Sequence, residues 1–284
     1  MNDKVMTISP SAWRLAASLA VAALFACGQG IERLSLPQQS AVLRLPAESV
    51  AAALQLSTVQ TLSAAAEHPL IRTLPASMRN GCPAMIAAWG ENPANTPQWR
   101  IRVLLRQPDG LWLALRCQSA DPQVRQYYDE RLAFVRPSSS TMQFLPFDRD
   151  AATDSRLFHV ELGERLPVQG FEAIAFRVTA DSDNPCCGGG DVVREEWLRL
   201  YVVSEPGVEQ ALSVLTLQDQ QSHDDEQGDS RIVRVTQVDF ERNAAGAVVA
   251  ALTRSREEVD GKLLGTSSAR YRWDSKARRF VAVP

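Results

Sequence analysis

The segment NPCCGGGD, residues 184–191, places two adjacent cysteines before three glycines. Neighbouring cysteines can form a disulfide whose small ring strains the intervening peptide, and strained disulfides are easier to reduce. The glycines tolerate positive φ angles and allow the chain to reverse direction. The segment therefore predicts a sulfur-held hairpin tip between the runs FEAIAFRVTA and EEWLRLYVV.

Metal, phosphate and dithiol chemistry fit this segment less well. Zinc sites need spaced ligands such as C-x-x-C with a second pair, whereas these cysteines are adjacent and the chain has only three histidines. A phosphate loop would need a Lys and a Ser or Thr after its glycines. We therefore expect no metal and no cofactor. A redox-responsive role for Cys186 and Cys187 is kept as an alternative.

Catalytic chemistry has little support in local motifs. The chain contains neither G-x-S-x-G nor H-E-x-x-H, so we expect no catalytic residues. The alternative is an exported hydrolase whose site is noncontiguous in sequence. Its candidate residues are Glu195, which shares a strand face with Trp197, and the histidines His159 and His223.

The first 26 residues have the composition of an export signal. Lys4 and Arg14 supply positive charge, and Leu15–Ala26 is an apolar run with one polar member, Ser18. This run is shorter than the roughly 20 apolar residues that a membrane-spanning helix needs. It matches the hydrophobic region of a secretory signal peptide, so we expect residues 1–26 to be removed.

Leu24-Phe25-Ala26-Cys27-Gly28 resembles the bacterial lipobox, which ends on the cysteine that receives a lipid. Leu24, Ala26 and Cys27 match the motif, while Phe25 stands where a small residue is usual. The resemblance implies a bacterial lipoprotein that is cleaved before Cys27 and attached to the membrane through its acylated N-terminus. Gly28, in place of an aspartate, implies the outer membrane, facing the periplasm. The alternative is a soluble periplasmic protein.

Export also bears on the four remaining cysteines, because disulfides form and persist outside the cytosol. Cys82, Cys117, Cys186 and Cys187 allow three connectivities. We favour a structural Cys82–Cys117 bridge, which leaves Cys186 and Cys187 to bond each other. Cross-links from the hairpin tip to Cys82 or Cys117 are the alternatives.

The elements that must position these residues are β-strands. RIRVLLRQPDGLWLALRCQ contains two alternating runs joined by Pro108-Asp109-Gly110, which suit a tight turn. Similar patterns predict hairpins that turn at 243–246 and 274–276. Further strands are expected at 132–135, 142–147, 172–179, 197–203 and 211–217. These elements predict a mainly β fold in which antiparallel hairpins form a sandwich- or barrel-like core.

Composition changes along the chain suggest its organisation. Residues 28–88 contain no aromatic residue, whereas aromatic residues are frequent from Trp89 onward. We expect a signal peptide (1–26), a tether and short helical or irregular leader (27–80), a first β unit (81–152) and a second β unit (153–284). The two β units can also form one continuous domain.

The net charge of the chain bears on which classes of partner it can bind. The net charge is -3 and the basic residues are dispersed, which argues against nucleic-acid binding. The expected partners are the membrane, through the N-terminal lipid, and an envelope protein or polymer. The sequence thus predicts an exported cell-envelope lipoprotein with a β-rich binding or structural domain.

Overall fold

The computed structural model describes residues 42–57, 59–62, 68–75, 79, 98–118, 128–145, 157–184, 191–205, 207–224 and 228–283. All of them belong to one compact unit, which spans Gln39–Pro284. The predicted boundary between the two β units falls within residues 146–156, outside the described residues.

Short strands and helices come first in the described chain, followed by a long hairpin. In chain order the elements are β1 (Val42–Arg44), α2 (Ala47–Leu54), β2 (Val59–Leu62), α3 (Pro69–Arg72), β3 (Gln98–Gln107), β4 (Gly110–Gln118), β5 (Tyr128–Arg136), the 3-10 turn η1 (Pro137–Ser139) and β6 (Thr141–Leu145).

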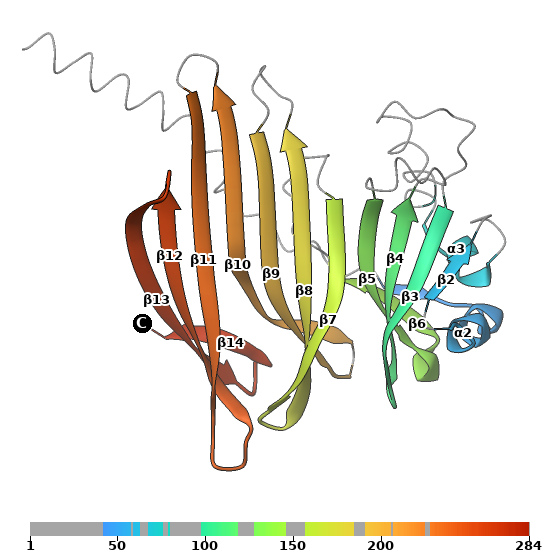
Figure 1. Ribbon diagram of the computed structural model, residues 1–284. Helices are drawn as coiled ribbons and strands as arrows, with labels where there is room; N and C mark the ends of the chain where they lie inside the picture. Colours follow the sequence, from blue (N-terminus) through green and yellow to red (C-terminus); the bar gives the residue numbers. More distant parts are fainter. Residues whose placement is uncertain are drawn as a thin grey trace, which may run out of the picture. The chain divides into compact units, whose positions relative to one another are not determined.

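The rest of the described chain consists of longer strands joined mainly by hairpins (Figure 1). They are β7 (Leu157–Val168), β8 (Phe171–Asn184), β9 (Asp191–Val203), β10 (Val208–Asp224), β11 (Gly228–Arg242), β12 (Val248–Val259), β13 (Lys262–Asp274) and β14 (Arg279–Val283).

The strands form two antiparallel sheets that pack together, which confirms the predicted mainly β, sandwich-like fold. The first sheet has the order β2-β3-β4-β5-β6-β1, and the second runs in chain order from β7 to β14. A single parallel residue pair, Asp129 with Phe158, joins β5 to β7. A second single pair, Val168 with Val248, brings β7 against β12 and curls the second sheet toward a barrel.

Three apolar clusters hold these layers together. One lies between the helices and the first sheet and includes Leu70 of α3 and Leu113 of β4. The second lies between the sheets, where Trp112 of β4 packs with Phe176 of β8. The third lies within the curl of the second sheet and includes Trp273 of β13. Alternation along each strand sends successive side chains to different clusters, as pleating requires.

The predicted leader contributes to the core. Leu45, Ala53, Leu56 and Leu70 are all buried in the cluster beneath the first sheet. The two helices are tied by a hydrogen bond from Ser49 Oγ to the Pro69 carbonyl at 3.1 Å. The leader segment from Ala47 onward forms the helix α2 in its Ala-rich part and the strand β2 further along.

A glutamine clamps the first sheet to the second. The Gln143 side chain of β6 donates from Nε2 to the Val208 carbonyl at 2.7 Å and accepts from the Val208 N–H at 2.8 Å. It therefore acts as a strand partner at the start of β10. A Cβ at Gly207 would lie 2.7 Å from Gln143 Oε1, so only glycine fits beside the clamp without a shift.

The predicted hairpins are confirmed, with longer strands than expected. β3–β4, β11–β12 and β13–β14 turn where the sequence indicates, and β8 pairs with β9 up to Asn184 and Asp191, on either side of the cysteine segment. The prediction at 211–217 was too short, because β10 extends to Asp224. β7 was not predicted, because Gly163 and Pro167 interrupt its alternation, and its register shifts between Leu162 and Arg165.

Replacing Trp112 with Ala should destabilise the protein by about 3–5 kcal/mol, the usual cost of emptying a buried aromatic site. The Trp112 ring is fully buried between the sheets, and its Nε1 donates to Gln107 Oε1 at 2.8 Å. Urea unfolding should show this loss. Val235→Ala, at a half-exposed position, should change stability by less than about 1 kcal/mol. Equal effects would contradict the assigned core.

Candidate functional site

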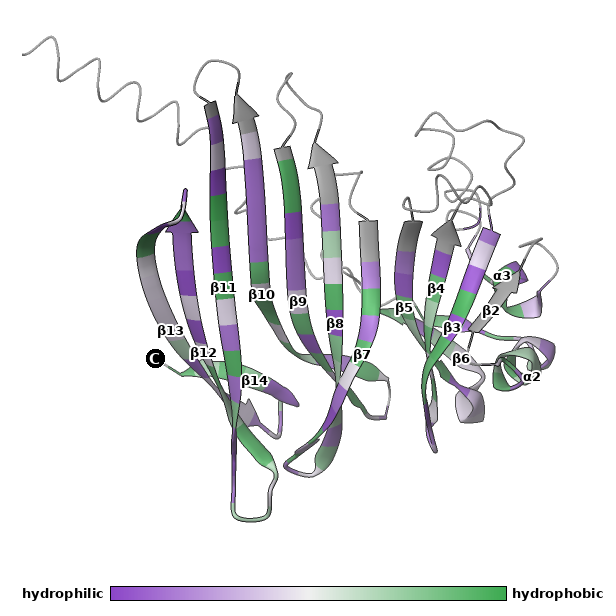
Figure 2. Ribbon diagram, in the orientation of Figure 1, coloured by the Kyte–Doolittle hydropathy of each residue, from purple (hydrophilic) through white to green (hydrophobic). Residues whose placement is uncertain are grey.

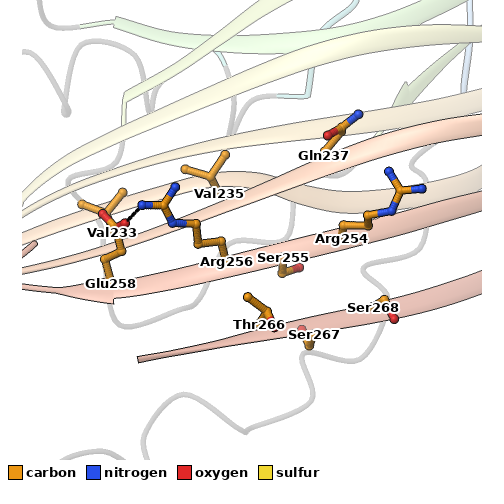
Figure 3. A pocket seen from close by; sticks show the side chains of 10 residues that line it. All are labelled: Val233, Val235, Gln237, Arg254, Ser255, Arg256, Glu258, Thr266, Ser267 and Ser268. Carbon is orange, nitrogen blue, oxygen red and sulfur yellow. Dashed lines mark hydrogen bonds and ion pairs between the residues drawn. The ribbon is translucent and has the colours of Figure 1, made fainter. Parts of the chain in front are cut away.

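A hollow of the described surface lies along β11, β12 and β13. Val233, Val235 and Gln237 alternate along β11 and therefore point to the same face. Their register partners on β12 are Glu258, Arg256 and Arg254. Thr266 and Ser268 of β13 complete the rows. Together these residues line a groove of about 640 Å³ (Figure 3), which we call the β11–β13 groove.

The floor and the walls of the β11–β13 groove differ in polarity. Val233 and Val235 provide apolar surface, and Val235 is 48% exposed. The arginines that flank them are neutralised within the chain. Arg254 binds Asp239 at 2.9 Å, and Arg256 forms an ion pair with Glu258. An apolar floor between compensated charges suits a neutral or amphipathic ligand better than a polyanion.

A second hollow lies beside the first and shares residues of β13 with it. It encloses about 390 Å³, and its lining includes Thr266, Ser267 and Leu264 of β13. It also includes Arg234 and Glu257, which form an ion pair across β11 and β12. In the strand register Arg234 pairs with Glu257, whereas Val233 and Val235 pair with Glu258 and Arg256. The second hollow therefore belongs to the opposite face of the sheet.

Polar side chains keep this part of the sheet open to water on both faces. Hydrophilic residues predominate in the C-terminal half of β12 and in much of β10 (Figure 2). Cross-strand ion pairs recur there: Arg231 binds Asp219 at 2.6 Å and Arg270 binds Glu241 at 2.6 Å. Each such pair contributes little stability when exposed. Their regular placement instead fixes the register of strands that lack a continuous apolar face.

Glu130 is the centre of a buried charge cluster at the seam between the sheets. Its carboxylate is fully buried on β5 and accepts hydrogen bonds from Arg102 Nη2 at 2.9–3.0 Å. Arg116 Nε lies 3.4 Å from its Oε1. The Val160 N–H of β7 donates to Oε2 at 2.7 Å, and Arg102 Nη2 donates to the Val160 carbonyl at 2.6 Å. Side chains thus replace the backbone ladder that β5 and β7 lack.

His159 links this cluster to solvent. Its Nδ1 lies 2.9 Å from Arg116 Nη2 and 3.1 Å from Glu130 Oε2. Nδ1 can form only one of these two hydrogen bonds at a time: the atom without a proton accepts from Arg116, and the atom with a proton donates to Glu130. Its Nε2 lies 3.3 Å from Glu161, which is exposed. His159 therefore bridges the buried Glu130 and the exposed Glu161.

The surroundings of Glu130 keep it ionised. Burial by itself would raise the pKa of the carboxyl group, but the hydrogen bond with His159, the charges of Arg116 and Arg102 and the Val160 N–H outweigh it. The net effect lowers the pKa of Glu130 below its ordinary value. A carboxylate with a lowered pKa is a weak proton acceptor, so this geometry suits a structural clamp better than general base catalysis.

The residues of the hydrolase alternative lie on different strands. His159 contacts Glu130, Arg116 and Glu161. Glu195 of β9 is only 7% exposed, and its register neighbours are Ala180 and Gln218. The backbone of His223 pairs with Asp229 on β11, and its side chain is outside the described residues. The hydrolase alternative stays a prediction.

The cysteines and the export signal are largely outside the described residues. This applies to Cys27, Cys82, Cys186 and Cys187, and for Cys117 only the backbone is described, paired with Trp99 and Asp129. Lipidation and the disulfides therefore stay predictions. Within the described ranges, no group of His, Cys, Asp and Glu side chains is placed to bind a metal ion. None of the described helices has the length and apolarity to cross a membrane.

Sequence reasoning missed both the groove and the charge cluster, although Glu130 left a signal. Glu130 lies two and four residues before Leu132 and Phe134, so strand alternation places all three on the inward face. A carboxylate on such a face needs buried partners. The groove gave no comparable signal, because polar alternation is also typical of any exposed strand.

Comparisons with known proteins give this chain no family. No family model, no curated protein and no solved structure matches it.

Replacing Glu130 with Gln should destabilise the fold by about 3–5 kcal/mol, because it leaves Arg102 and Arg116 buried without their counter-charge. The substitution should also change acid unfolding. A lowered folded-state pKa contributes stability that is present above the ordinary carboxyl value of about 4.3 and is lost as pH falls through the folded value.

Urea unfolding measured between neutral and acid pH tests both effects. The difference in stability between the wild-type chain and the Glu130→Gln variant should be greatest at neutral pH and should shrink below about pH 4. Glu161→Gln is the matched control, because Glu161 is exposed, and it should lie within about 1 kcal/mol of wild type. A gap for Glu130→Gln that stayed constant at acid pH would refute the clamp.

Proposed function

We propose that this chain is an exported cell-envelope lipoprotein whose β domain binds an envelope partner through the β11–β13 groove. The groove is the observation that carries the proposal, because it combines an exposed apolar floor, Val233 and Val235, with compensated charges and hydroxyl groups. Surfaces of this kind bind ligands by apolar contact and use a few polar groups to orient them.

The arrangement of the two sheets supports a binding role for this region. The Glu130 cluster and the Gln143 clamp hold the sheets together through their buried side chains. The groove strands β11 and β12 are held together by continuous antiparallel pairing and by cross-strand ion pairs. A pre-formed surface loses less conformational entropy when a ligand binds, which favours recognition. The resemblance of residues 24–28 to a lipobox supports a membrane location for this surface.

Membrane attachment is tested by Cys27→Ser. Expressed with its own signal in a Gram-negative host, the wild-type chain should sediment with membranes and partition into detergent, since an acylated N-terminus anchors stably. The Cys27→Ser variant should move to the soluble periplasmic or uncleaved fraction. Ser35→Ala, a change in the same segment that leaves Cys27 intact, should behave like wild type. A soluble wild-type chain with unmodified Cys27 would support the soluble periplasmic alternative.

The binding role is tested by site-specific photocrosslinking in cells. A photoreactive residue at Gln237, in the groove, should give discrete adducts with envelope components, because bound ligand lies within reach of that side chain. The control places the photoreactive residue at Arg165, an exposed position on β7, and should give no adducts. The charged floor variant Val235→Asp should abolish the Gln237 adducts, since it removes the apolar contact. Adducts that persist in Val235→Asp would refute the groove as the binding site.

A further inference from the structure

The outer edge of β13 is open next to the β11–β13 groove. β14 pairs only with Arg270–Asp274 of β13, and no strand in the described part of the chain pairs with the outer side of Lys262–Ala269. Every residue of that segment is exposed. Leu263 and Leu264 are 60% and 68% exposed, and a Cβ added at Gly265 would meet no atom within 4 Å. We call Lys262–Ala269 the β13 edge.

The β13 edge is weakly protected, because Lys262 and a register irregularity near Leu264 are its only protective features. Edge strands are usually short or carry several charges or a proline, since unpaired N–H and C=O groups recruit other strands. Residues 263–269 read LLGTSSA and contain no charge and no proline. The register irregularity near Leu264 leaves Gly265–Ala269 in regular pairing with β12. β14, by contrast, is only five residues long and buries Phe280.

We propose that the β13 edge binds an extended peptide segment of a partner protein, which adds to the sheet as a further strand. The inference rests on the proposed function and names its partner class. The two hollows carry it: the β11–β13 groove and the hollow on the opposite face both include Thr266 and Ser267 of the edge. An added strand sends alternate side chains to opposite faces of a sheet. Both sets of side chains would therefore meet a hollow.

Charge defines the peptide further. The arginines and glutamates around both hollows are paired with each other, so the hollows suit apolar or neutral side chains. Lys262 is the one charged residue of the β13 edge. The matching peptide therefore has apolar or small residues along its length and an acidic residue at the end that lies against Lys262.

Charge also argues against a second copy of this chain as the occupant. If two β13 edges paired antiparallel over their full length, Lys262 of each copy would lie opposite Ala269 of the other. The β13 edge contains no Asp or Glu, so a second copy offers Lys262 no counter-charge. A partner peptide with an acidic end supplies one.

The test selects linear peptides from a displayed random library against the full chain purified from membranes in detergent. Selected peptides should combine apolar or small residues with an acidic end. Hydrogen exchange should show new protection at residues 262–269 when such a peptide is added. In an added strand, the N–H groups of every second peptide residue point toward β13, and those of the residues between them point away. N-methylation of the residues whose N–H groups face β13 should weaken binding roughly fivefold per donor, whereas N-methylation of the other set should have little effect.

Leu263→Lys should weaken peptide binding at least about tenfold, because a lysine on the edge opposes strand addition. Val192→Lys is the matched control. Val192 is 44% exposed but pairs with strands on both sides, so the variant should bind within about twofold of wild type. Circular dichroism and urea unfolding verify that both variants are folded.

Three outcomes would overturn the proposal. The first is binding of the selected peptides that Val235→Asp abolishes but that neither Leu263→Lys nor N-methylation of either set of peptide residues affects. That result would place binding in the groove alone, which leaves the proposed function intact. A wild-type dimer in sedimentation that Leu263→Lys dissociates would assign the edge to a second copy. A library that yields no specific peptide would exclude this partner class, and the crosslinks at Gln237 report separately on the proposed function.

Discussion

The burial of one carboxylate, Glu130, is the constraint on which the joining of the two sheets depends. β5 and β7 share a single backbone pair, so the ladder that usually continues a sheet is missing at this seam. The Glu130 side chain accepts the Val160 N–H, and Arg102 donates to the Val160 carbonyl, which together satisfy the backbone of β7. A buried ion pair is a weak source of net stability, but breaking it is costly because a charge is left unpaired. The cluster therefore specifies which strands meet more than it adds to stability.

This seam separates two kinds of sheet. Next to it, side chains of β4, β5, β8 and β9 fill an aromatic cluster centred on Trp112. Farther from the seam, the parts of β10–β13 that lie outside the third apolar cluster carry cross-strand ion pairs and hydroxyl groups in place of apolar contacts. Strands that are polar on both faces gain little from burial, so their register must come from hairpin turns and from charge pairing. The turn at Asp260-Gly261 shows this, because both residues have the positive φ angles that a two-residue hairpin turn requires.

Local sequence signals predicted the hairpins and the fold class, while the site depended on contacts between distant residues. Pro108-Asp109-Gly110 and the glycine near 246 indicate turns through backbone geometry alone, and the structure has hairpins at both. β7 escaped prediction because Gly163 and Pro167 break its alternation. Its place is secured by its ladder with β8 and by the hydrogen bond from the Val160 N–H to Glu130. Alternation with Leu132 could have placed Glu130 on an inward face, but its partners are 28 and 30 residues away. Pattern alone also cannot distinguish the groove strands from any solvated strand.

An unpaired strand edge on a sheet whose two faces are both exposed to solvent is physically consistent with a reversible interaction. The β13 edge offers backbone donors and acceptors, yet the flanking faces carry paired charges and only isolated apolar side chains such as Val235 and Leu264. Strand addition supplies hydrogen bonds that each contribute about 1 kcal/mol net, and apolar contact with the two hollows must supply the rest. Selectivity then follows from the hollows, since backbone bonds are the same for every peptide. On the proposed binding role, the groove and the edge would form one recognition surface, in which the backbone provides the common contacts and the side chains provide the discrimination.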